Sequence, residues 1–277
     1  MATSHQWTSK DGLSLYAREW QVTDPRAIIA LVHGLGEHVG RYEHVAAHLN
    51  ARAYAVLGFD QRGHGQSGGK RGHASDYGTL LDDVQLLLRE AELRYPAVPV
   101  VLYGHSLGGN LVLNYALRRQ PRIQALVATS PFIRETHPQS GMKVGLGKLM
   151  RHVYPSLTLP NGLDVRGISR DAAVVARYQA DPLIHDKLSA AMGIGTLEAA
   201  DWLAKYTGHV PCPTLLVHGT ADPITDPRAT AAFAGRTRGD LTFLPFEGLY
   251  HETHNEPEQA QVLAAITDWL DKQVPKR

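Results

Sequence analysis

The chain has 277 residues, of which 43% are hydrophobic, so it can bury a sizeable core and is not expected to be disordered. Its 28 Lys and Arg residues balance 27 Asp and Glu residues, and the absence of long runs of like charge argues against a nucleic-acid partner. No signal peptide or run of about 18 apolar residues is present, and Cys212 is the single cysteine, so we expect a cytoplasmic protein without an intrachain disulfide.

Short apolar runs, each closed by Gly, Asp, Ser or Pro, predict buried parallel strands. Between them, residues 79–95 and 257–274 place apolar side chains on one helical face, and Thr79 with Asp82 fits a capping box. Strands that alternate with helices are typical of an α/β fold, with a mostly parallel central sheet flanked by helices. The predicted strands are residues 27–32, 54–59, 99–103, 123–128, 214–218 and 241–246.

The alternation stops between residues 133 and 208, where no run has the pattern of a buried strand and Gly, Pro and short helical patterns dominate. We interpret residues 133–208 as an inserted helical cap, with residues 1–132 and 209–277 as the two parts of the core. Adaptable methionine side chains suit a surface for a flexible apolar ligand, and filling gaps in a small helical unit is the alternative. The methionines of this segment are Met142, Met150 and Met192.

Ser106 lies at the centre of "YGHSLGG" (residues 103–109), between a predicted strand and a predicted helix. This is the context of the G-x-S-x-G nucleophile elbow, in which a sharp turn lifts the serine hydroxyl above the sheet edge. Gly104 and Gly108 are expected because side chains there would collide with neighbouring backbone. Ser106 is therefore the candidate nucleophile.

A serine nucleophile needs a histidine base and an acid, which in this fold follow the serine in the order acid, then histidine. Asp222 directly follows a predicted strand, whereas its rival Asp226 precedes Pro227 and a helix, where Asp is an ordinary N-cap. His251 is closer to the end of the last predicted strand than its rival His254. Placement thus favours Asp222 and His251.

Several motifs in the same order and spacing are similar to the monoacylglycerol lipase and lysophospholipase family of the α/β-hydrolase superfamily. The resemblance implies Ser106 as nucleophile, Asp222 as acid, His251 as base, and a cap that acts as a lid over an acyl-chain tunnel. It also implies an oxyanion hole made by the backbone N–H groups of Leu35 and Leu107. The motifs are "HGLGEH" (33–38), "RY" (41–42), "FDQRGHGQSGGKRG" (59–72), "GHSLGG" (104–109), "SPF" (130–132), "HGTADPITD" (218–226) and "YHETHNEP" (250–257).

The oxyanion assignment also has a physical basis, because "HGLG" ends a predicted strand and lets backbone amides converge beside the elbow. We interpret His33 as a brace for this loop, and Glu37 and His38 receive no role. No phosphate-loop, dinucleotide or zinc pattern is complete, so neither cofactor nor metal is expected.

The expected partner is a small-molecule lipid ester, most of all a monoacylglycerol. A lysophospholipid or a general carboxylic ester is the alternative, and transient contact of the cap with a membrane surface is compatible with the sequence. A serine at the elbow excludes haloalkane dehalogenases and epoxide hydrolases, whereas acidic residues in the cap leave an iminopeptidase open, and a weakly catalytic receptor is a further alternative. The oligomeric state is left open. The acidic cap residues are Glu135, Asp164, Asp171, Asp181, Asp186, Glu198 and Asp201.

Overall fold

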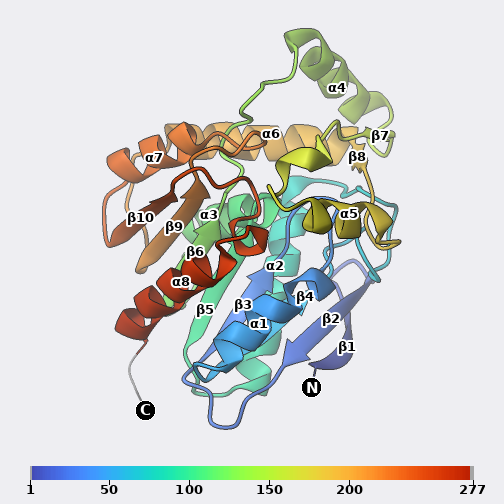
Figure 1. Ribbon diagram of the computed structural model, residues 1–277. Helices are drawn as coiled ribbons and strands as arrows, with labels where there is room; N and C mark the ends of the chain where they lie inside the picture. Colours follow the sequence, from blue (N-terminus) through green and yellow to red (C-terminus); the bar gives the residue numbers. More distant parts are fainter. Residues whose placement is uncertain (1, 275–277) are drawn as a thin grey trace.

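The computed structural model describes residues 2–274, and its centre is an 8-stranded sheet in the order β1-β2-β4-β3-β5-β6-β9-β10 (Figure 1). β2 pairs antiparallel with both β1 and β4, and all other neighbours in the sheet are parallel. The mostly parallel α/β sheet predicted from the sequence is thereby confirmed. The strands are β1 (Ala2–Thr8), β2 (Ser14–Trp20), β3 (Ala27–Val32), β4 (Tyr54–Phe59), β5 (Val100–His105), β6 (Ala125–Thr129), β9 (Thr214–Gly219) and β10 (Leu241–Phe246).

Helices cover both faces of the sheet, because successive strand side chains point to opposite faces. In β3, Ile28 and Ala30 belong to the apolar cluster under α2 and α3, whereas Ile29 and Leu31 belong to the cluster under α1 and α8. The predicted flanking helices are therefore present as two layers. The helices of the core are α1 (Glu43–Asn50), α2 (Tyr77–Arg94), α3 (Leu107–Arg119), α7 (Pro227–Arg236) and α8 (Gln259–Gln273), with 3₁₀ turns at Val39–Tyr42 and Thr253–Asn255.

Three details differ from the sequence prediction. β1 and β2 were not predicted, because an edge hairpin with one solvated face carries no continuous apolar run. β10 is an edge strand and only half-buried, not buried as predicted. The capping box at Thr79 is wrong: α2 begins at Tyr77, and the Asp76 carboxylate accepts both the N–H and the hydroxyl of Thr79.

Between β6 and β9 the chain leaves the sheet and forms helices and one pair of short strands, among which no strand of the main sheet is found (Figure 1). In α6, Met192 and Leu203 join the apolar cluster under α2 and α3, so Met192 fills the main core, whereas Met142 on α4 is 87% exposed. The division of the chain into a core and a cap at residues 133–208 remains a proposal. The elements of this segment are α4 (Gly141–Val153), β7 (Thr158–Pro160), a 3₁₀ turn (Val165–Gly167), α5 (Ala172–Ala180), β8 (Lys187–Ser189) and α6 (Ala190–Lys205).

Among residues 2–274, no helix combines the length and the apolar character that crossing a membrane would require.

Candidate active site

Ser106 occupies the turn between β5 and α3, with φ 54° and ψ −114°. A non-glycine residue rarely adopts positive φ, and such strain persists where the surrounding packing imposes it. The packing is tight: a Cβ on Gly108 would lie 2.1 Å from the carbonyl oxygen of Val32, and one on Gly104 would lie 2.3 Å from the carbonyl oxygen of Gly108. Both glycines are therefore needed for α3 to approach β3 and hold the serine at the strand end.

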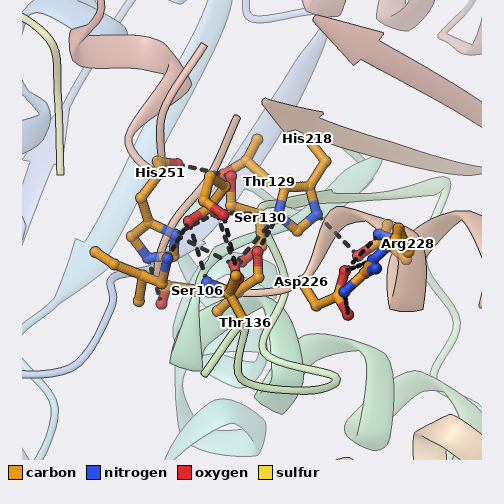
Figure 2. Close-up of polar contacts among 12 residues, drawn as sticks. Ser106, Thr129, Ser130, Thr136, His218, Asp226, Arg228 and His251 are labelled. Atoms are coloured by element: carbon orange, nitrogen blue, oxygen red, sulfur yellow. Dashed lines mark hydrogen bonds and ion pairs between the residues drawn. The ribbon is translucent and has the colours of Figure 1, made fainter. Parts of the chain in front are cut away.

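The structure brings Ser106, Asp222 and His251 together from the carboxyl ends of three parallel strands. His251 Nε2 lies 2.8 Å from Ser106 Oγ, and His251 Nδ1 lies 2.7 Å from Asp222 Oδ2. Figure 2 shows Ser106 beside His251 in this cluster. All three residues are buried, and a hydrogen bond of 2.6 Å from the Ser130 hydroxyl to the carbonyl oxygen of His251 fixes the backbone of the histidine loop. The arrangement can move a proton from the serine to the imidazole.

The rival residues have other partners. Asp226 is the N-cap of α7, where it accepts a hydrogen bond of 2.9 Å from the N–H of Arg228 and pairs with Arg134 at 2.8 Å. The ring of His254 stacks on Tyr42, with centroids 5.1 Å apart, and meets His105 edge-on at 4.8 Å. Asp226 thus has the capping role that its position before Pro227 predicts, and His254 packs behind the site.

Hydrogen bonds surround the carboxylate of Asp222. Its Oδ1 accepts the N–H groups of Ile224 and Thr225 at 2.7 and 3.0 Å, and its Oδ2 accepts the Thr225 hydroxyl at 2.8 Å. Burial alone would raise the pKa of Asp222, but the charge of His251 and hydrogen bonds from His218 and His251 lower it well below its ordinary value. Asp222 therefore stays ionised.

The contacts with Asp222 also change the pKa of His251. Burial opposes the charged form of His251, yet attraction to the Asp222 carboxylate, helped by Glu252 and Glu37, raises the pKa of His251 above its ordinary value. His105 lies against His251 with ring centroids 4.9 Å apart, and burial lowers the pKa of His105 to about 3. A neutral His105 therefore adds no positive charge beside the base.

The loop after β3 lies directly against the serine. A Cβ on Gly34 would be 3.3 Å from Ser106 Cβ, and the Gly34 N–H donates to Glu37 Oε1 at 2.6 Å. Within the described residues, the N–H groups of Leu35 and Leu107 have no hydrogen-bond acceptor. His33 braces the loop, because its Nε2 accepts the N–H of Gln61 at 2.9 Å.

A buried ionic cluster of Glu37, Arg41 and Glu252 lies beside the site and was missed from the sequence. The guanidinium group of Arg41 binds Glu37 Oε2 at 2.6 Å and both oxygens of Glu252 at 2.6 and 2.7 Å. Burial raises the pKa of Glu37, whereas Arg41 overcomes the effect of burial and lowers the pKa of Glu252. The only sequence signal was the i, i+4 spacing of Glu37 and Arg41 and the position of Glu252 next to His251.

The cavity at Ser106 is small. It has a volume of about 20 Å³, which is close to the space of a single water molecule. Leu163, Ile168 and Tyr178 cover it from the segment between β6 and β9, and the polar wall is formed by Glu37 and Glu252 with the residues of the loop and the elbow. A larger open hollow of about 420 Å³ lies at the other end of β5 and is remote from this chemistry.

No group of His, Cys, Asp and Glu side chains in the described part of the chain is arranged to hold a metal ion. The expectation that neither a cofactor nor a metal is needed stays a prediction.

A family model described as "Serine aminopeptidase, S33" matches residues 23–258. The monoacylglycerol lipase of Mycolicibacterium smegmatis is 34% identical over 271 residues, covering 97% of this chain and 96% of that protein. An abhydrolase domain-containing protein of Dictyostelium discoideum is 38% identical over 271 residues, but this chain spans only 28% of its length. The crystal structure of Paleococcus ferrophilus monoacylglycerol lipase is similar with a TM-score of 0.87 and 35% identity, covering 94% of this chain and 99% of that one.

Proposed function

This chain belongs to the hydrolase family described as serine aminopeptidase, S33, and we propose that it is a serine esterase that cleaves monoacylglycerols through an acyl-enzyme on Ser106. The observation that carries the proposal is the hydrogen-bonded line from Ser106 Oγ through the imidazole of His251 to Asp222. Similarity to monoacylglycerol lipases over nearly the whole chain supports the choice of substrate.

In the proposed reaction, His251 Nε2 takes the proton of Ser106 as the hydroxyl oxygen attacks the ester carbonyl carbon. The negative charge that develops on the carbonyl oxygen accepts hydrogen bonds from the free N–H groups of Leu35 and Leu107, each contributing roughly 3 kcal/mol. The imidazolium, stabilised by Asp222, then protonates the leaving glycerol oxygen as the C–O bond breaks. Water, deprotonated by His251, releases the fatty acid and restores the serine.

The wall of the cavity suits an ester with an apolar acyl chain and a polar alcohol. Leu163, Ile168 and Tyr178 offer apolar surface, whereas Glu37 and Glu252 offer carboxylate oxygens that can accept hydrogen bonds from hydroxyl groups. Because the cavity holds only about one water molecule, we propose that the part of residues 133–208 that carries Leu163, Ile168 and Tyr178 acts as a lid that moves to admit the chain, while α6 stays packed on the core.

The exposed face of α4 supports transient contact of the cap with a lipid surface. Met142, Leu146, Leu149 and Val153 recur at helical spacing and are 57 to 87% exposed, which is unusual for large apolar side chains on one helix face. Such a helix can lie in the interface of a membrane, with basic residues alongside it attracted to anionic lipids. We propose a cytoplasmic enzyme that reaches its substrate at such a surface. The basic residues of α4 are Lys143, Lys148 and Arg151.

An aminopeptidase needs a carboxylate at the site to bind the substrate amine. None of the acidic cap residues lines the cavity at Ser106: for example, Asp181 pairs with His38 at 2.8 Å and Glu198 with Arg151 at 2.7 Å. Glu37 and Glu252 do line it, but both are already paired with the guanidinium group of Arg41. This arrangement favours an ester over an amine-bearing peptide.

The proposal is tested with the parent chain and with Ser106→Ala, which should keep the fold and lose about six orders of magnitude in rate. A long-chain monoacylglycerol, p-nitrophenyl acetate and proline arylamide are compared by kcat/KM, and a fluorophosphonate probe is located by mass spectrometry. We expect the monoacylglycerol to be the best substrate and the label to sit on Ser106. A label elsewhere contradicts the nucleophile, and preference for the arylamide contradicts the esterase.

A further inference from the structure

A second histidine contacts the carboxylate of Asp222, and nothing in the proposed reaction uses it. His218 lies near the end of β9 and is completely buried. Its Nε2 lies 3.0 Å from Asp222 Oδ2 and 3.1 Å from the carbonyl oxygen of Thr225, and its Nδ1 lies 2.8 Å from Thr230 Oγ1 in α7. Figure 2 shows His218 and His251 on opposite sides of the cluster of polar contacts.

The neighbours of His218 determine which ring nitrogen carries the proton. Nε2 faces the ionised carboxylate of Asp222 and a carbonyl oxygen, both of which only accept. Its third neighbour, the Thr225 hydroxyl at 3.2 Å, already donates its proton to Asp222 Oδ2, so Nε2 must donate. In the neutral form of the ring, Nδ1 is then an acceptor, and the fully buried hydroxyl of Thr230 is placed to donate to it. Hydrogen bonds therefore run in one direction, from Thr230 through His218 to Asp222.

We infer that His218, held in one tautomer by Thr230, is a positioning residue for the reaction at Ser106. It donates to the same carboxylate oxygen, Oδ2, that accepts the hydrogen bond from His251. It thus fixes the orientation of Asp222 from the side of α7, and it takes up part of the negative charge that would otherwise attract the proton on His251. The inference rests on the proposed function, because it assigns a partner to the acid of that reaction.

A histidine that only filled the core would behave differently from one that sets the charge of Asp222. Loss of filling volume would lower stability and leave the basicity of His251 unchanged. Loss of the donor concentrates negative charge on Oδ2, so the imidazolium of His251 is held more strongly and loses its proton at higher pH. The pH at which Ser106 becomes reactive therefore separates the two roles.

The experiment measures the rate of labelling of Ser106 by a fluorophosphonate probe as a function of pH, which requires no knowledge of the natural substrate. His218→Gln places an amide nitrogen as many bonds from the backbone as Nε2 and keeps a donor, whereas His218→Leu has none. The acid limb of this profile is the pH range in which the labelling rate rises as His251 loses its proton. In His218→Leu we expect this limb to move to higher pH by several tenths of a unit. At pH values above the limb, we expect labelling of this variant to be slower than that of the parent by about tenfold. His218→Gln should stay close to the parent.

Thr230→Val keeps the shape of the side chain and removes the hydroxyl, and Thr230→Ser restores the hydroxyl. These variants test the same chain of hydrogen bonds if His218→Leu fails to fold. The acid limb of the labelling profile should move to higher pH in Thr230→Val and should lie at the pH of the parent in Thr230→Ser. The other ionisable groups near His251, namely Glu37, His105, Glu252 and His254, are the same in all variants.

An acid limb that is unchanged or lower in both His218→Leu and Thr230→Val would overturn the inference while leaving the serine esterase intact. Equal profiles for the Gln and Leu variants would overturn it as well, because they would show that the donor is irrelevant. Failure of the parent to be labelled at Ser106 would instead reject the proposed function.

Discussion

At the residue scale, the charged side chains around His251 are buried, and each is paired with an opposite charge or with hydrogen-bond donors. Asp222 is 3% exposed and has hydrogen bonds to both of its oxygens. Arg41 is held between Glu37 and Glu252 directly behind His251. A buried charge that loses its partner costs several kcal/mol, whereas a fully paired one holds its neighbours in one geometry. The base is therefore surrounded by groups that cannot reorient independently.

The two aspartates of the 218–226 loop should respond differently to removal of their charge. Asp222→Asn is expected to lower kcat by about 10⁴, because an amide no longer stabilises the imidazolium or favours the productive tautomer of His251. Asp226→Asn should stay within about tenfold of the parent, because asparagine is also a good N-cap for α7. Steady-state kinetics on a soluble ester measures both, and the reverse ranking would transfer the role of the acid to Asp226.

At the scale of elements, the ends of the parallel strands place the reactive groups and the inserted segment covers them. Ser106 follows β5, Asp222 follows β9 and His251 follows β10, at the edge where parallel strands end together. α4 contributes nothing to the cavity at Ser106 and instead presents apolar side chains outward, on the far side of α6 (Figure 1). The reaction at Ser106 and the contact with a lipid surface, as we propose them, thus belong to different elements.

Removal of the apolar face of α4 should therefore affect only substrates presented in a lipid phase. The double variant Leu146→Ser with Leu149→Ser should lower binding to monoacylglycerol-containing vesicles by tenfold or more, since burying a leucine side chain contributes about 1.5–3 kcal/mol. Hydrolysis of dissolved p-nitrophenyl butyrate should not change. Leu93→Ser is the matched control, because Leu93 is 65% exposed on α2, outside the cap. An equal loss on the dissolved ester would mean that α4 supports the fold rather than the lipid contact.

At the scale of the whole molecule, one of the contacts between the proposed cap and the rest of the chain lies at the loop that follows β3. The N–H of His185 donates to the carbonyl oxygen of Gly36 at 3.0 Å, and Asp181 pairs with His38 at 2.8 Å. Burial alone would raise the pKa of Asp181, but the hydrogen bond from His38, together with the other contacts of this carboxylate, outweighs this effect, so the pKa of Asp181 is lowered. If the lid within residues 133–208 moves as proposed, its movement is therefore coupled to the loop that carries the N–H of Leu35.

A small cavity with an apolar cover predicts a dependence on acyl length. Each methylene buried beneath the opened cap contributes up to about 0.8 kcal/mol, so kcat/KM should rise by at most roughly fourfold per methylene until the space is filled. Triacylglycerols should react far more slowly than monoacylglycerols, because further chains have no space to enter. Initial rates for monoacylglycerols from acetate to laurate test this, with the same chains as p-nitrophenyl esters for comparison. If kcat/KM did not depend on acyl length, the protein would instead be a general carboxylesterase.

The amino-acid sequence by itself determined the features that depend on local pattern. Apolar runs located the parallel strands to within two residues, because a strand buried on both faces is continuously apolar. The nucleophile elbow was also recognisable from the sequence, because Gly104, Ser106 and Gly108 lie in one turn and each is needed by that turn. Chain order and distance from a strand end also favoured Asp222 and His251 over their neighbours. The mostly parallel α/β fold followed from the alternation of these segments.

Only the tertiary structure decided what depends on contacts between distant segments. The hairpin of β1 and β2 has polar residues on its solvated face and is recognisable only once it pairs with β4. Arg41 and Glu252 are 211 positions apart in the chain, and His218 differs from any other histidine only through its contacts with Asp222 and Thr230. The small cavity at Ser106 likewise arises where residues of the segment between β6 and β9 meet the ends of the parallel strands. Local sequence patterns record the secondary structure that a segment adopts, whereas buried charges and hydrogen bonds are set by which segments meet after folding.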